Sequence, residues 1–244
     1  MPQDLNQKQI PAQTPERKIR LSPSGATRWL QCPGSVHAEA QYLQSPSSLA
    51  ADQGTQCHAL SEEILIKHFG IDQKPSELLS HIRVNIEMMD AADAYTDFCI
   101  KLYNTYKEID DTTSLIVEKR LDVSSKIPKC FGRADTLITG KDFIHIVDLK
   151  YGRHKVQTEG NDQLRIYAVG ALLENTKASV IRITVFQPRI NNVSTAEYSR
   201  QELEDWVKVI QPIAQAAVDG SDIFVGGEWC FFCLHKENCN RAVK

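Results

Sequence analysis

Hydrophobic and polar positions follow a helical period over the N-terminal half of the chain. This spacing predicts a helix over about 48–69, ended by Gly70, and a long amphipathic helix over about 75–109. A shorter helix is expected between a cap at Ser24 and a stop at Pro33-Gly34. The apolar positions that define one face of the long helix are Leu78, Ile82, Ile86 and Met89.

The pattern then changes to short, partly alternating segments rich in β-branched residues. Turn residues such as Gly140-Lys141-Asp142 separate them, which predicts an antiparallel meander. Helical spacing returns over 160–175, a strand follows over 178–188, and Ser199 with Glu202 predicts a capping box that begins a last helix. The order of elements indicates an α/β or α+β core with a helical N-terminal layer. The three meander strands are expected at 114–123, 131–139 and 142–150.

Composition is that of an ordinary globular chain, with 42% hydrophobic and 24% charged residues in 244. We expect a mobile polar leader over 1–18 and a single domain over 19–244. No apolar run reaches the roughly 18 residues of a membrane helix, and no signal-peptide core is present, so a cytoplasmic location without membrane contact is expected. The net charge of -3 argues against a protein that simply coats DNA, but not against an enzyme with an acidic metal site.

Two acidic residues and a lysine form the most informative motif. Asp135 is the last residue of the segment Gly132-Arg133-Ala134-Asp135. Asp148, the first residue of Asp148-Leu149-Lys150, follows Asp135 by thirteen positions. On a strand, Asp148 and Lys150 share a face, and a meander would place Asp135 beside them. Two close carboxylates favour a cation such as Mg²⁺ or Mn²⁺, and the lysine can orient water and offset charge. The alternative is an ordinary solvated strand face.

Other candidate residues flank this motif. Gln163 and Tyr167 lie one turn apart on one helix face, where they can bond a phosphate or stack on a base. His58, in Gly54-Thr55-Gln56-Cys57-His58, is a candidate only in combination with the acidic pair, because a single helix histidine is usually a surface residue. Glu118 could face the same site, although a solvated strand carboxylate is the more common arrangement.

The chain carries four short motifs in the order GTxxH, GxxD, DxK and QxxxY. Together they resemble the motifs of the RecB-like nucleases in the PD-(D/E)xK superfamily. The resemblance spans about residues 21–240 and implies a restriction-endonuclease-like core, with a central mixed sheet flanked by helices. It departs from the superfamily's nominal pattern at Ala134, where a proline is usual. The roles that it implies are metal binding by His58, Asp135, Asp148 and the main-chain carbonyl of Leu149, catalysis by Lys150, and contact with DNA by Gln163 and Tyr167.

Four of the seven cysteines form a second pattern. Cys230, Cys233 and Cys239 are clustered near the C-terminus, and Cys32 lies about two hundred residues earlier. Four thiolates can hold zinc or an iron–sulfur cluster, and the single CxxC fits a zinc ribbon poorly. The pattern resembles the iron staple of AddB and of CRISPR-associated RecB-like exonucleases. That resemblance implies a 4Fe-4S cluster, with the cysteine-rich C-terminal loop closing on the N-terminal region. The remaining cysteines, expected in the core, are Cys57, Cys99 and Cys130.

The resemblance implies a metal-dependent DNA exonuclease, phage-encoded or bacterial, that acts on single strands or ends in recombination, repair or CRISPR-type processing. No GxxxxGK[ST] motif is present, so a helicase, recombination or CRISPR partner would be a separate protein. Two alternatives stay open. One is a non-catalytic module that binds DNA ends with the nuclease fold, and the other is a zinc-stabilised protein that binds a partner.

Overall fold

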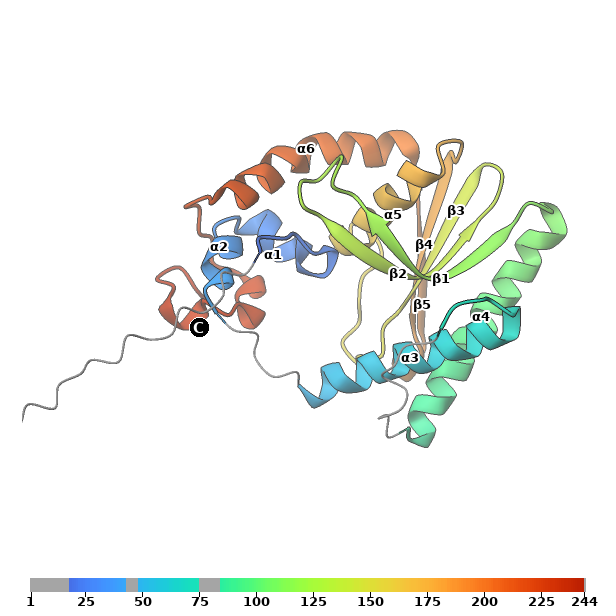
Figure 1. The fold of residues 1–244 in the computed structure, drawn as a ribbon. Coiled ribbons are helices and arrows are strands. Elements are labelled where there is room, and N and C mark those ends of the chain that lie inside the picture. Colours follow the sequence, from blue (N-terminus) through green and yellow to red (C-terminus); the bar gives the residue numbers. More distant parts are fainter. Residues whose placement is uncertain (1–17, 43–47, 75–83, 244) are drawn as a thin grey trace, which may run out of the picture.

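A five-stranded mixed sheet forms the centre of the computed structural model, which describes residues 18–42, 48–74 and 84–243 (Figure 1). The strands lie in the order β1-β2-β3-β4-β5. The first three form an antiparallel meander, β3 and β4 are parallel, and β5 returns antiparallel to β4. The strands are β1 (Ser114–Asp122), β2 (Phe131–Thr139), β3 (Phe143–Leu149), β4 (Val180–Gln187) and β5 (Asn192–Ser199).

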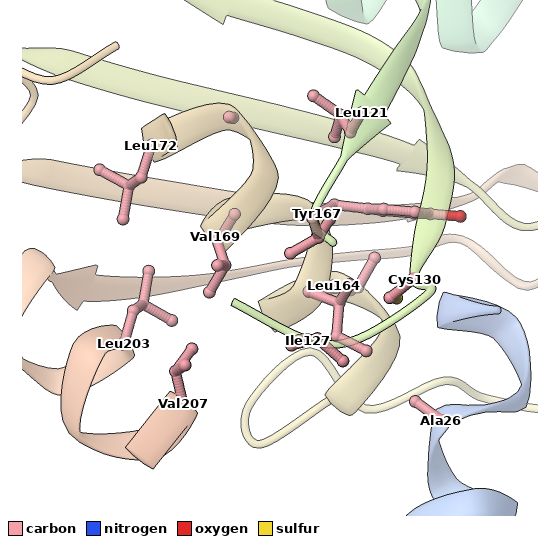
Figure 2. Close-up of a cluster of buried hydrophobic side chains, with 14 of the residues drawn as sticks. Ala26, Leu121, Ile127, Cys130, Leu164, Tyr167, Val169, Leu172, Leu203 and Val207 are labelled. Carbon is pink, nitrogen blue, oxygen red and sulfur yellow. The ribbon is translucent and has the colours of Figure 1, made fainter. Parts of the chain in front are cut away.

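Helices cover both faces of this sheet, so β3 is buried along its whole length. On one face, α3 (Leu49–Phe69) and α4 (Ile86–Ile109) pack on Val147 and Leu149. On the other face, α5 (Asp162–Glu174) and α6 (Arg200–Asp219) cover Ile144 and Ile146. Figure 2 shows the second core, where side chains of α5 and α6 meet. Alternation along β3 therefore points Asp148 toward the α5 face and Leu149 toward the α3 face.

The two ends of the described chain meet beside this second core. The short helices η1 (Pro23–Gly25), α1 (Ala26–Gln31) and α2 (Ser35–Ala40) lie against the C-terminal turns η4 (Glu228–Phe232) and η5 (Lys236–Asn238) (Figure 1). The Leu234 N–H donates to Glu39 Oε1 at 2.9 Å, and the Tyr42 hydroxyl lies 2.9 Å from His235 Nδ1. The predicted closure of the C-terminal loop on the N-terminal region is confirmed.

The α/β fold class and its central elements agree with the sequence-based prediction. The ends of two helices agree because their capping residues are recognisable in the sequence. Ser48 and Ser199 cap α3 and α6, and Glu202 completes the predicted capping box. Gly70 ends α3 in the left-handed conformation. The three cysteines expected in the core, Cys57, Cys99 and Cys130, are fully buried. None of the helices in the described ranges is long and apolar enough to cross a membrane.

Four details of the prediction need correction. The Ser22 hydroxyl, not that of Ser24, caps the first helical turn by accepting the Gly25 N–H at 3.2 Å. The long helix begins at Ile86 behind an Asn85 cap, and residues 75–83, with Leu78 and Ile82, lie outside the described residues, as do 1–17 of the expected leader. Ile86 and Met89 are exposed, because α4 turns a different stripe to the core. The helix α2 and the strand β5 were not predicted.

Candidate metal centre and cysteine cluster

Three side chains from three different elements converge near the C-terminal end of β3. His58 comes from α3, Glu118 from β1 and Asp135 from β2, and one ligand atom of each lies within 4.8 Å of the other two. The Nδ1 atom of His58 is 3.3 Å from Asp135 Oδ1. The other Asp135 oxygen accepts the Leu149 backbone N–H at 2.7 Å. We call His58, Glu118 and Asp135 the acidic trio.

Glu118 joins the trio through an irregularity in β1. Its φ is 50°, in the left-handed region that costs a residue with a side chain about 1–2 kcal/mol. Val117 pairs with Thr136 and Lys119 pairs with Ala134, so the ladder is interrupted at Glu118. The side chain is only 12% exposed, unlike the solvated carboxylate that is common on a strand. Backbone strain of this kind is concentrated at functional sites.

Burial and neighbouring charges together shift the pKa values of the three side chains in the trio. Burial, assisted by the Asp135 carboxylate, raises the pKa of Glu118 to about 7. Burial opposes the charged form of His58, but the Asp135 charge and hydrogen bond outweigh it and raise the pKa of His58 to about 9. Burial likewise opposes ionisation of Asp135, yet His58 and Lys150 hold the pKa of Asp135 below its usual value. The trio therefore needs added positive charge, from protons or from a cation.

A second group of side chains begins at Asp148 and runs across the α5 face. Lys150 Nζ lies 2.8 Å from Asp148 Oδ2, which confirms that these two side chains share a face of the strand. The same ammonium donates to Gln163 Oε1 at 3.4 Å, and Gln163 Nε2 donates to the Tyr167 hydroxyl at 3.0 Å. The candidate residues of the DxK and QxxxY motifs thus form one continuous hydrogen-bonded chain. We call it the lysine chain.

The glycine of the GxxD motif has a steric role beside this chain. A Cβ atom at Gly132 would lie 2.6 Å from Pro23 Cγ and 2.7 Å from Tyr167 Cε1. Any larger residue would therefore push apart the turn η1 and the aromatic ring of Tyr167. The absence of a side chain at Gly132, in the GxxD motif, thus leaves room for Tyr167, the last residue of the QxxxY motif.

The structure divides the predicted metal ligands between the two groups. His58 and Asp135 are in the trio, whereas Asp148 does not lie within 4.8 Å of all three members and pairs with Lys150 instead. Leu149 lines the small cavity of the trio, of about 10 Å³, and its N–H donates to Asp135. Glu62, which was not assigned to the site from the sequence, is buried and lines the same cavity. The sequence signal for it is its position one helical turn after His58.

The four candidate cysteine ligands line a second cavity, between α1 and the C-terminal turns. The Val225 N–H donates to Cys32 Sγ, and the Gly227 N–H donates to Cys230 Sγ, each at 3.4 Å. Within the described ranges, no three of the four sulfurs lie within 4.8 Å of one another. Tetrahedral zinc, with Zn–S bonds of about 2.3 Å, holds its thiolates about 3.8 Å apart. The remaining two ligand candidates in this cavity are Cys233 and Cys239.

Comparisons with known proteins cover nearly the whole chain. The sequence profile of the DUF2800 family, described as "Protein of unknown function", matches residues 19–244. The crystal structure of SSO0001 is 15% identical over 95% of this chain and 91% of that one, with a TM-score of 0.41. The crystal structure of a "Putative exonuclease" from Eubacterium rectale is 15% identical over 93% of this chain and 90% of that one, with a TM-score of 0.47. Structural similarity at this level does not indicate a shared activity.

Proposed function

The chain belongs to the DUF2800 family, and we propose that it is a metal-dependent deoxyribonuclease of the RecB-like kind, acting on single strands or ends of DNA. One observation carries this proposal: the acidic trio converges within 4.8 Å beside a lysine that a further carboxylate holds. Carboxylates and an imidazole attract a divalent cation, and the adjoining ammonium supplies positive charge to a reacting anion. Together they suit hydrolysis of a phosphodiester bond.

The donor set of the trio fits Mg²⁺ or Mn²⁺. Two carboxylates offer the oxygen ligands that these ions prefer, and imidazole is compatible with Mn²⁺. Burial and the neighbouring Asp135 carboxylate raise the pKa of Glu118, and a divalent ion would favour the ionised form of Glu118. When bound, the ion would neutralise phosphate charge and make a bound water more acidic. His58, Glu118 and Asp135 would hold it.

Lys150 acts in this proposal as a fixed cation. Burial would lower the pKa of its ammonium, but Asp148 and Asp135 more than offset this effect and raise the pKa above the usual value. The side chain is therefore charged at neutral pH and cannot accept the proton of an attacking water. It can donate hydrogen bonds to that water and offset the negative charge that grows on the phosphate.

A basic loop directly after Lys150 supports a polyanionic substrate. Residues 153–155, Arg-His-Lys, are exposed, and Arg153 pairs with the exposed Glu87. The fully buried Gln187 fixes this loop, because its Nε2 donates to the carbonyls of Gly152 at 3.2 Å and His154 at 2.9 Å. A rigid loop can hold its charges against a phosphate backbone at less cost in entropy than a mobile one. DNA contact by Gln163 and Tyr167, at the far end of the lysine chain, belongs to the same proposal.

For the cysteine cavity we propose a 4Fe-4S cluster held by Cys32, Cys230, Cys233 and Cys239. Two observations support it. Among the described residues, any three of these sulfurs include a pair more than 4.8 Å apart, a wider spacing than a single tetrahedral ion requires. Backbone N–H groups point at two of them, and hydrogen bonds to sulfur are a regular means of tuning iron–sulfur centres. The cluster would hold residues 19–244 together as one domain.

Metal binding should release a proton from His58 at neutral pH. Its pKa of about 9 in the metal-free site means that the ring is protonated below that value, and a ligand nitrogen must be neutral. Mn²⁺ affinity should therefore rise with pH until about pH 9, and the acid limb of the cleavage profile should move to lower pH when Mn²⁺ is raised tenfold. Titration calorimetry in two buffers of different ionisation enthalpy measures the released proton.

His58→Gln should abolish this proton release, whereas the exposed His154→Gln should preserve it. If wild-type protein binds Mn²⁺ at pH 7.5 without releasing a proton, and the acid limb stays fixed as metal rises, His58 is not a metal ligand.

The proposed function and its metal site can be tested together by cleavage of end-labelled single-stranded DNA over a Mn²⁺ titration. Glu118→Gln should raise the Mn²⁺ concentration for half-maximal rate by about tenfold or more, because the site loses a charged ligand. The matched control is Glu197→Gln, since Glu197 is an exposed strand carboxylate paired with Arg182 at 2.8 Å. Wild-type inactivity at every Mn²⁺ concentration would refute the nuclease. An unchanged titration in Glu118→Gln would remove only Glu118 from the ligand set.

A further inference from the structure

A groove of about 730 Å³ lies between the N-terminal segment and the C-terminal turns. Lys18, Arg20 and Arg28 line it, opposed by the carboxylate of Glu39. Arg28 Nε pairs with Glu39 Oε2 at 2.8 Å, and the charges of these two side chains therefore cancel. Lys18 and Arg20 are exposed and form no ion pair with any residue in the described ranges. The groove therefore carries net positive charge in a chain whose overall charge is negative.

Two neighbouring aromatic rings lie beside this groove. Phe231 and Phe232 are 72% and 77% exposed, and Phe232 lines the groove. Their ring centroids are 4.8 Å apart in an edge-to-face arrangement. Two exposed rings in contact with each other form a small apolar patch beside the groove, and exposed apolar patches are a feature of contact surfaces. Lys236 adds a cation 5.7 Å from the centre of the Phe231 ring.

The turn η1 connects the groove to the lysine chain. Ser22, Ser24 and Gly25 line the groove, and Pro23 in the same turn lies against Gly132 and Tyr167. Figure 2 shows α1, at Ala26, next to the cluster that contains Tyr167. Contacts thus continue from the groove through Tyr167 and Gln163 to the ammonium of Lys150.

From this arrangement we propose that the groove binds the unpaired strand of a DNA substrate and guides it to Lys150, an inference that rests on the proposed nuclease function. Phosphates would lie against Lys18 and Arg20, and bases would stack on Phe231 and Phe232. An aromatic platform favours a single strand because base faces are covered in a duplex. Cationic side chains beside exposed rings complement the alternating charge and aromaticity of such a strand.

The test measures binding of fluorescent oligodeoxythymidylate, of about 16 nucleotides, to full-length protein in EDTA. The double variant Phe231→Ala/Phe232→Ala should weaken binding by about tenfold or more, as expected for the loss of base stacking. Its affinity for a blunt duplex should change by less than about threefold. Replacing both residues with tryptophan should retain affinity. The exposed Val209 on α6 gives the control, because Val209→Ala should have no effect.

A charge variant tests the other half of the groove. Lys18→Glu/Arg20→Glu should reduce the slope of log affinity against log salt by about 1.4, since each lost contact with a single strand contributes about 0.7. Oligonucleotide affinity and salt slope that stay unchanged in both double variants would overturn the inference. So would conversion of a dimer to a monomer by Phe231→Ala/Phe232→Ala with unaltered DNA affinity, because the rings would then form an interface between copies.

The nuclease itself is assayed separately with thymidine 5′-monophosphate p-nitrophenyl ester, which is too small to need the groove. If wild type and both double variants hydrolyse this ester equally while oligonucleotide binding is also equal, the groove inference fails and the nuclease stands. Weaker oligonucleotide binding by the variants supports the groove even if wild type does not hydrolyse the ester, a result that would count against the nuclease alone.

Discussion

Replacing Lys150 by methionine should lower the rate of DNA cleavage by about 10²- to 10³-fold, the range found when one preorganised charge-stabilising donor is removed. The ammonium is held by Asp148 at 2.8 Å and contacts Gln163, and in the proposed function it donates to the attacking water and offsets charge on the phosphate. Affinity for DNA should change by less than about threefold, because phosphate contacts elsewhere dominate binding. Single-turnover cleavage in Mn²⁺, compared with oligonucleotide anisotropy in EDTA, separates the two effects.

This variant needs a control for folding, because it leaves Asp148 buried without its partner. Asp148 is 2% exposed, and breaking one side of such a buried pair typically costs about 3–5 kcal/mol. The double variant Lys150→Met/Asp148→Asn removes both charges and should recover most of that stability while remaining inactive. Lys208→Met provides the matched exposed pair, since Lys208 lies 2.7 Å from Asp205 on α6, and should cleave normally. Near-normal turnover by Lys150→Met would refute the role assigned to the lysine.

Changing Cys233 to serine should remove the iron–sulfur cluster and destabilise the whole fold. Wild-type protein purified without oxygen is expected to be brown, with iron and sulfide in stoichiometric amounts. The cluster would close a loop of roughly 200 residues between Cys32 and Cys230. A cross-link over such a loop stabilises the chain by about 5 kcal/mol, which corresponds to a fall of about 10–20 °C in Tm when it is lost. Differential scanning calorimetry and elemental analysis measure both effects.

Cys130→Ser is the control for this experiment, because Cys130 is also buried but packs in the core beside Leu21. It should keep full iron content and lose only the usual 1–2 kcal/mol or so of a core substitution. Stoichiometric zinc without iron or sulfide in wild-type protein would exclude the cluster. Full iron content in both Cys233→Ser and Cys32→Ser would exclude these residues as ligands.

The elements that sequence reasoning identified are those in which local and long-range signals agree. The capped helix at 49–69 and the meander from Ser114 to Leu149 combine clear periodicity with turn residues at their ends. The strand β5 was missed because only Ala196 and Tyr198 are buried in an otherwise polar segment. The helix α2 was missed because it begins directly after Pro33-Gly34, a pair that usually ends a helix.

In the candidate site, too, local features could be predicted from the sequence and non-local ones could not. Motif spacing was enough to place Asp148 and Lys150 on one strand face, because period-two alternation is a local property. It did not indicate that Glu118 lies close to both His58 and Asp135. That proximity depends on a left-handed backbone conformation at Glu118, which a strand pattern does not signal. The contact of Gly132 with Tyr167 is also non-local, since it joins two motifs that are separate in sequence.

Whether the trio and Lys150 form a metal-dependent nuclease site can be decided by incubating anaerobically purified protein with end-labelled single- and double-stranded DNA in Mg²⁺, Mn²⁺ or EDTA. We expect release of labelled nucleotides from single strands or ends with Mn²⁺ or Mg²⁺, none with EDTA, and none with Asp135→Asn. Intact DNA in every condition, with protein that binds both Mn²⁺ and DNA, would contradict this expectation and leave a DNA-end binding module as the function.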